Sequence, residues 1–136
     1  MKAEALNWSI SVSAKRPIVS LDFDGVLHMY RGWDGNIPTN KPVEGALEAV
    51  KWMLAAGFKL FILSTRAHNN PAGKAGIESW LIQNGFPPIR VTSEKEHADI
   101  YVDDRGWRFE GPQSWPVLIA YLKDNPIPGR WGGSGL

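Results

Sequence analysis

The chain has 136 residues, of which 43% are hydrophobic and 21% are charged, a composition typical of a single globular domain with a buried core. The net charge of +1 gives no strong field of one sign, so the composition carries no strong nucleic-acid-binding signature. The absence of cysteine excludes disulfides, thiolate metal sites and cysteine nucleophiles.

Nothing in the sequence predicts a membrane segment or a signal peptide. The longest apolar runs are far shorter than a membrane span, and the first residues lack a continuous apolar stretch. We therefore expect a cytoplasmic protein with no membrane partner. A single domain over 1–136 is predicted, with a core at about 17–123 and flanking segments at 1–16 and 124–136, the latter rich in Pro and Gly.

Three elements are expected in the first half of the chain. Residues 17–22 (PIVSLD) are short, β-branched and apolar, which predicts a buried strand ending in an acidic residue. Apolar side chains recur at helical spacing between Pro42 and Gly57, which predicts a helix of about four turns. Residues 59–63 (KLFIL) are a second apolar run, short enough to be a strand.

The second half continues this alternation. A helix capped by Asn70 is predicted up to Gly85, followed by strands at 89–92 and 99–102. Residues 115–122 are predicted as a helix in preference to an edge strand. Because parallel neighbours require crossover connections, this order predicts an α/β fold in which helices cover a parallel sheet.

The segment Asp22-Phe23-Asp24-Gly25 directly follows the first predicted strand. Residues i and i+2 of a strand project to the same side, so Asp22 and Asp24 would meet where the strand leaves the sheet. One carboxylate of such a pair can attack phosphorus while the other handles the proton. A surface turn in which both residues cap local amides is the competing interpretation.

A second acidic pair, Asp103-Asp104, follows the strand at 99–102. If this strand lies beside the first, both acidic ends line one crevice at the carboxyl edge of the sheet, where open α/β folds bind ligands. Together with Asp22, the pair would supply the hard oxygen ligands that Mg²⁺ prefers. The alternative is a solvated turn.

Candidate phosphate-binding residues are Ser64, Thr65 and Arg66 at the end of the second strand, and Lys95 ahead of the fourth. A serine bonded to its own backbone and a solvated lysine are the competing interpretations. The three histidines show no metal-ligand spacing and are interpreted as loop residues: His28, His68 and His97.

Taken in order, IVSLDFDGVL, FILST, Lys95 and IYVDDR resemble motifs one to four of the haloacid dehalogenase-like (HAD) phosphohydrolase superfamily, over about residues 17–105. The resemblance implies a Rossmann-like three-layer sandwich with a central, mostly parallel sheet. It also implies an aspartyl-phosphate on Asp22, acid–base work by Asp24, phosphate contacts from Ser64 and Lys95, and Mg²⁺ held by Asp22, the backbone carbonyl of Asp24 and Asp103 or Asp104.

Two features refine this resemblance. Phosphatases of the superfamily carry the second Asp of the first motif, present here as Asp24, whereas dehalogenating members lack it. Only 17 residues separate Asp24 from Pro42 and only 30 separate Ser64 from Lys95, which leaves no room for a cap domain. An open site is therefore expected beside a flap at 28–40. Its Tyr30, Arg31 and Trp33 are candidates for substrate contact, with ordinary loop packing as the alternative.

The predicted function is Mg²⁺-dependent hydrolysis of a phosphate monoester, on a small molecule or on a nucleotide or oligonucleotide end. Two alternatives stay open. One is a phospho-accepting receiver-like signalling module, although a receiver places its acidic residues and lysine in a different order along the chain. The other is a catalytically silent HAD-fold scaffold.

Overall fold

The computed structural model describes residues 16–33, 35–103 and 107–124. The expected N-terminal flank before residue 16, the expected tail after residue 124, and Asp104 therefore lie outside the described residues.

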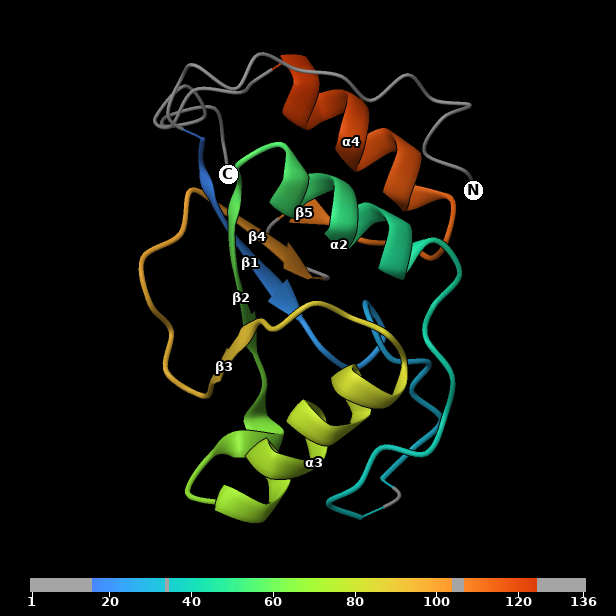
Figure 1. Cartoon of the computed structure of the whole chain (residues 1–136), viewed down its shortest axis with the longest axis vertical. Helices are drawn as coiled ribbons and strands as arrows, with labels where there is room; N and C mark the ends of the chain where they lie inside the picture. The colour runs from blue at the N-terminus through green and yellow to red at the C-terminus, as the bar shows by residue number, and fades with distance from the viewer. Residues whose placement is uncertain (1–15, 34, 104–106, 125–136) are drawn as a thin grey trace.

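The centre of the molecule is a five-stranded sheet in which every paired neighbour is parallel (Figure 1). The strands stand in the order β3-β2-β1-β4-β5. Their bounds are β1 (Ile18–Asp22), β2 (Lys59–Leu63), β3 (Arg90–Thr92), β4 (Ile100–Asp103) and β5 (Trp107–Arg108). The predicted α/β class with a parallel sheet is confirmed, whereas the short strand β5 was not predicted.

Among the residues that the structure describes, three α-helices and one short 3-10 turn accompany the sheet: α2 (Ala46–Ala55), α3 (Pro71–Gln83), α4 (Ser114–Asp124) and η1 (Thr65–Ala67). Helices α2 and α4 contact one another and lie side by side in Figure 1, whereas α3 contacts β3 and η1. Within the described ranges, none of the helices has both the length and the apolar character needed to cross a lipid bilayer.

The central strand β1 is buried on both of its faces. Val19 and Leu21 point to one face and Ser20 to the other, and all three are almost inaccessible to solvent. The sequence of a strand covered on both sides is a continuous apolar run rather than an alternation of apolar and polar residues. For this reason residues 17–22 could be recognised as a strand from the sequence. The carboxyl end of β1 is therefore anchored in the middle of the core.

One predicted helix start and one predicted capping bond differ from the structure. Helix α2 begins at Ala46 rather than near Pro42, because Pro42 bridges to His28 and the Val43 amide donates to the carbonyl of Leu27 at 2.8 Å. Asn70 precedes α3 but makes no side-chain capping bond; its Nδ2 donates instead to Oδ1 of Asn36 at 2.9 Å. In both cases, contacts with the flap at 28–40 replace the local helix signal.

Helix α3 owes its position to two glycines that lower its intrinsic stability as a helix. A Cβ atom at Gly73 would lie 2.0 Å from the carbonyl oxygen of Arg66, and one at Gly76 would lie 1.9 Å from that of Asn36. No residue with a side chain fits at either point without a backbone shift. The close approach fixes α3 against both η1 and the flap.

Candidate active site

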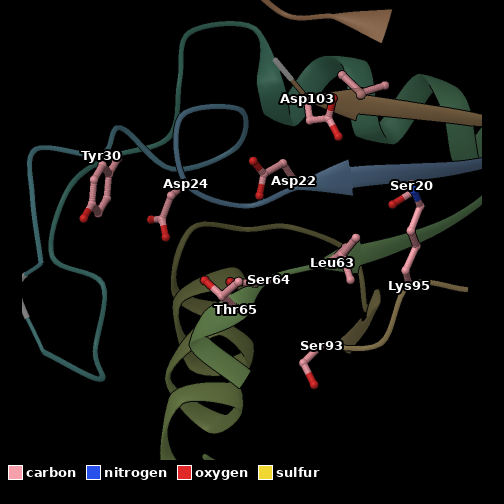
Figure 2. A pocket seen from close by; sticks show the side chains of 11 residues that line it. Ser20, Asp22, Asp24, Tyr30, Leu63, Ser64, Thr65, Ser93, Lys95 and Asp103 are labelled. Carbon is pink, nitrogen blue, oxygen red and sulfur yellow. The ribbon is translucent and has the colours of Figure 1, made fainter. Parts of the chain in front are cut away.

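A cavity of about 480 Å³ opens at the carboxyl ends of β1, β2 and β4 (Figure 2). The three described carboxylates predicted for the site, Asp22, Asp24 and Asp103, all line it. So do Ser64, Thr65 and Lys95. Residues spread over more than seventy positions of sequence thus meet where parallel strands end, the usual ligand-binding edge of open α/β folds.

Asp22 and Asp103 are brought together by strand register. Strands β1 and β4 are direct neighbours, and Leu21 pairs with Val102, so the next residue of each strand is an aspartate at the same level. Asp22 Oδ1 also accepts a hydrogen bond from the Phe23 amide at 2.9 Å, which orients its carboxylate at the strand end. The adjacency of β1 and β4, which the sequence left as a condition, is what places both acids on one cavity.

Asp24 is held by three N–H donors. Its Oδ2 accepts from Nε of Arg66 at 2.7 Å, and its Oδ1 accepts from Nη2 of Arg66 at 3.1 Å. A third contact joins Oδ1 to Nδ1 of His28 at 2.8 Å. The fork from Arg66 fixes the plane of the carboxylate as well as its position.

His28 is fully buried, and its hydrogen bonds define which ring nitrogen carries the proton. Nε2 faces the backbone N–H of Asn40 at 3.2 Å and must accept, so Nδ1 holds the proton and donates to Asp24. The ring is stacked on Phe23 and contacted edge-on by Trp80. His28 lies in the segment between β1 and α2, outside the helices and strands as predicted, but its burial and its contact with Asp24 were not predicted. Its spacing of four residues from Asp24 was the available signal.

Arg66 does not line the cavity, although it was predicted to bind phosphate. Its side chain is 2% exposed and lies behind Asp24, where Nη1 also donates to the carbonyl of Gly35 at 3.0 Å. The guanidinium carbon lies 4.9 Å from the Trp33 ring and 5.8 Å from the Phe23 ring. In this structure the Arg66 guanidinium binds Asp24 and the flap, and its predicted contact with phosphate stays a prediction.

Ser64 combines the two roles that the sequence left as alternatives. Its hydroxyl accepts from the amide of Arg66 at 3.2 Å and thereby caps η1, while the residue also lines the cavity. Thr65 follows it at the cavity wall. Two further hydroxyls that sequence reasoning missed, Ser20 and Ser93, line the same cavity.

Lys95 reaches the cavity from a loop that is anchored on both sides. Its ammonium lies 4.9 Å from the ring of Tyr101, and the Tyr101 hydroxyl donates to the carbonyl of Glu96 at 2.5 Å. Arg90 forks onto the Glu96 carboxylate with two bonds of 2.7 Å. This hydrogen-bonded pair lowers the pKa of Glu96 and raises that of Arg90. The loop that carries Lys95 is therefore held in place by hydrogen bonds from Arg90 and Tyr101 to Glu96.

The charge of the cavity bears on whether Mg²⁺ fits. Its described lining carries three carboxylates and one ammonium, so a phosphate dianion would meet net repulsion unless a cation were bound. In the described part of the chain, no three side chains of Asp, Glu, His or Cys converge into a complete metal cage. Mg²⁺ rarely uses such a cage and keeps water and substrate oxygens as ligands. The donor chemistry therefore fits Mg²⁺ with Asp22 and Asp103 as carboxylate ligands.

No family model, no curated protein and no solved structure matches this chain. The resemblance to the HAD superfamily therefore depends on the motif residues themselves and on where the fold brings them.

Proposed function

We propose that the protein hydrolyses phosphate monoesters with the help of Mg²⁺, on a capless, Rossmann-like fold of the HAD type. The observation that carries this proposal is the meeting of Asp22, Asp24, Asp103, Ser64 and Lys95 on one cavity. These are a nucleophile, an acid–base group, a metal ligand and two phosphate-binding groups. A cytoplasmic location and a small-molecule or oligonucleotide substrate belong to the same proposal.

The reaction takes place in two displacements. A carboxylate oxygen of Asp22 attacks phosphorus, and the bond from phosphorus to the ester oxygen breaks. Asp24 gives a proton to the departing oxygen; because the structure shows Asp24 as the ion-paired acceptor of Arg66 and His28, it must take up that proton from solvent before this step. Water then attacks the phosphorus of the acyl phosphate, Asp24 takes a proton from that water, and Asp22 and inorganic phosphate are released. The Asp22 residue is regenerated, and the net change is addition of one water across the ester.

The other residues act by position and charge. Lys95 and the hydroxyl of Ser64 hold the phosphoryl oxygens, whose charge spreads during transfer. Arg66 and His28 hold Asp24 at a fixed orientation toward the cavity. Bound Mg²⁺, held by Asp22, Asp103 and the Asp24 carbonyl, would supply electrostatic neutralisation between the carboxylates and the phosphate. Asp104 lies outside the described residues and stays a candidate ligand.

The direct test is turnover of an aryl phosphate by the purified full chain in Mg²⁺. Asp22→Asn is expected to abolish turnover, and Asp24→Asn to allow phosphoenzyme formation with little turnover. Glu78→Gln, an exposed change on α3, is the matched control and is expected to behave as the wild type. Chelation by EDTA should remove activity and added Mg²⁺ should restore it.

Each alternative has its own outcome in this experiment. Absence of hydrolysis for every monoester in a broad panel would support the catalytically silent scaffold. A stable phosphorylated Asp22 formed from a small phosphodonor, without turnover, would support the receiver-like module. Activity that EDTA leaves unchanged would reject the assignment of Mg²⁺.

A further inference from the structure

A second cavity, of about 580 Å³, adjoins the carboxylate cavity. Tyr30 lines both of them. The second cavity is formed by the start of the flap, by the segment leading into α2 and by the turn before α4. Its size is in the range of pockets that hold small organic ligands. A group joined to a phosphate in the first cavity would be directed past Tyr30 into the second.

The lining of the second cavity differs in chemistry from that of the first. Met29, Pro42, Val43 and Pro112 contribute apolar surface. Its charged residues, Lys41 and Glu44, are exposed and have opposite signs, so they produce no net charge there. The second cavity therefore suits a neutral, largely apolar group, whereas the first suits a phosphate accompanied by a cation.

Tyr30 itself is held in place and yet accessible. The Met29 amide before it donates to the carbonyl of Lys41 at 3.0 Å, and the preceding His28 is buried against Phe23. The Tyr30 side chain nevertheless remains 49% exposed, and Figure 2 shows it across the mouth of the cavity from Asp22, on the side of Asp24. An exposed aromatic ring on an anchored backbone, beside reacting groups, is suited to stacking on a flat ligand.

The flap carries more exposed apolar surface than its surroundings. Of the five large hydrophobic side chains that are exposed in the described residues, three belong to it: Tyr30, Trp33 and Ile37. Clustered exposed apolar residues beside a cleft indicate a binding surface rather than chance exposure. Of these three side chains, Tyr30 is the one that lines both cavities.

We propose that the second cavity binds the leaving group of the phosphate monoester, and that this group is a neutral, planar aromatic ring stacked on Tyr30. The inference rests on the proposed phosphatase function and deepens it, because it names the class of substrate. A nucleobase and a simple aryl-alkyl group share this chemistry. Tyr30 is a specificity-determining residue in this scheme and takes no part in proton transfer.

Binding and turnover should be measured separately, so that failure of this inference is distinguishable from failure of the proposed function. Binding uses the non-hydrolysable phosphonates ethylphosphonate, cyclohexylethylphosphonate and phenethylphosphonate, titrated by calorimetry into the full chain with Mg²⁺. Turnover uses the corresponding alkyl phosphates, whose leaving-group oxygens have similar basicity, so that differences in kcat/KM report recognition rather than intrinsic reactivity. Adenosine monophosphate tests whether a nucleobase that is joined to the phosphate through a ribose can reach the second cavity.

Phenethylphosphonate is expected to bind about tenfold or more tightly than the ethyl and cyclohexylethyl compounds. This difference in affinity is what stacking on a single aromatic side chain typically contributes. Tyr30→Ala should remove this preference, with a loss of kcat/KM about tenfold larger for phenethyl phosphate than for ethyl phosphate, and Tyr30→Phe should retain the preference. Ile82→Ala, an exposed apolar change on α3, is the control and should have no effect.

Two results would overturn the inference. One is equal affinity of the wild type for all three phosphonates while ethyl phosphate is still hydrolysed. The other is an aromatic preference that survives in Tyr30→Ala. If the protein binds no phosphonate and hydrolyses no monoester, the proposed function itself fails and the leaving-group assignment fails with it.

Discussion

The ion pair between Arg66 and Asp24 links the stability of the fold to the geometry of the candidate site. A double-mutant cycle with Arg66→Met, Asp24→Asn and the combined variant isolates the energy of this pair. Methionine keeps an apolar side chain of similar length but removes the guanidinium, which lies near the Trp33 and Phe23 rings. Asparagine keeps the shape of the aspartate and removes its charge.

The expected magnitude follows from burial and hydrogen-bond geometry. The Arg66 side chain is 2% exposed and that of Asp24 is 25% exposed, and the two N–O distances are 2.7 and 3.1 Å. Removing one partner of a fully buried pair costs about 3–5 kcal/mol. Because water reaches a quarter of Asp24, Arg66→Met should lower the free energy of unfolding by about 3 kcal/mol. The coupling energy of the pair should be about 2 kcal/mol.

The assay is urea denaturation at neutral pH, followed by far-ultraviolet circular dichroism. A matched control lies in the same protein, because Arg90 forks onto Glu96 with two bonds of 2.7 Å but with side chains 55% and 39% exposed. The cycle with Arg90→Met and Glu96→Gln should give a much smaller coupling, since solvent screens exposed pairs. Equal coupling in the two cycles, or a value below about 0.5 kcal/mol for Arg66 and Asp24, would refute the reasoning.

Three further predictions concern the framework of the site. Gly76→Ala should lower the free energy of unfolding by about 1–3 kcal/mol in urea denaturation, because the new Cβ would lie 1.9 Å from the Asn36 carbonyl oxygen, although alanine is the better helix former by about 1 kcal/mol. Lys74→Ala is the exposed control on the same helix, and stabilisation by Gly76→Ala would contradict the proposed close approach. Mg²⁺ should raise the Tm of the wild type, and Asp103→Asn should remove most of that rise; an undiminished rise in the variant would exclude Asp103 as a ligand. Finally, the fork from Arg90 holds the pKa of Glu96 below its ordinary value of 4.5, so the stability that this pair contributes is present above that value and is lost as the pH falls through the lowered pKa. Arg90→Met should raise the pKa of Glu96 in an NMR titration, and an unchanged value would reject the pairing.

Local sequence patterns were sufficient for most of the elements. The runs at 17–22 and 59–63 are strands within one residue of the predicted bounds, because buried parallel strands need continuous apolar side chains. The helix at 71–83 also appears despite its two glycines. Errors arose where the flap contacts other elements. The sequence predicted a helix start near Pro42, but Pro42 forms an isolated β-bridge with His28, fourteen residues earlier in the chain.

The candidate site was predictable to the extent that its residues stand at strand ends. Asp22 and Asp103 share a cavity because their strands are neighbours, a condition that the sequence could only state as a hypothesis. The environment of Asp24 was not predictable. Arg66 lies 42 residues from Asp24 in the sequence, and its side chain could equally have faced a phosphate. The direction of its guanidinium depends on packing against Trp33 and Phe23, which the sequence does not reveal.

The sequence by itself determined the α/β class, the order of strands and helices, and the set of acidic, hydroxyl and lysine residues from which a phosphate site could be built. These features depend on hydrophobic periodicity and on residue type, which are local properties of the chain. Only the tertiary structure decided that β1 and β4 are neighbours, that His28 and Arg66 hold Asp24, and that Tyr30 separates two cavities. Those outcomes depend on contacts between distant segments, whose geometry is set by close packing of the whole core rather than by any one segment.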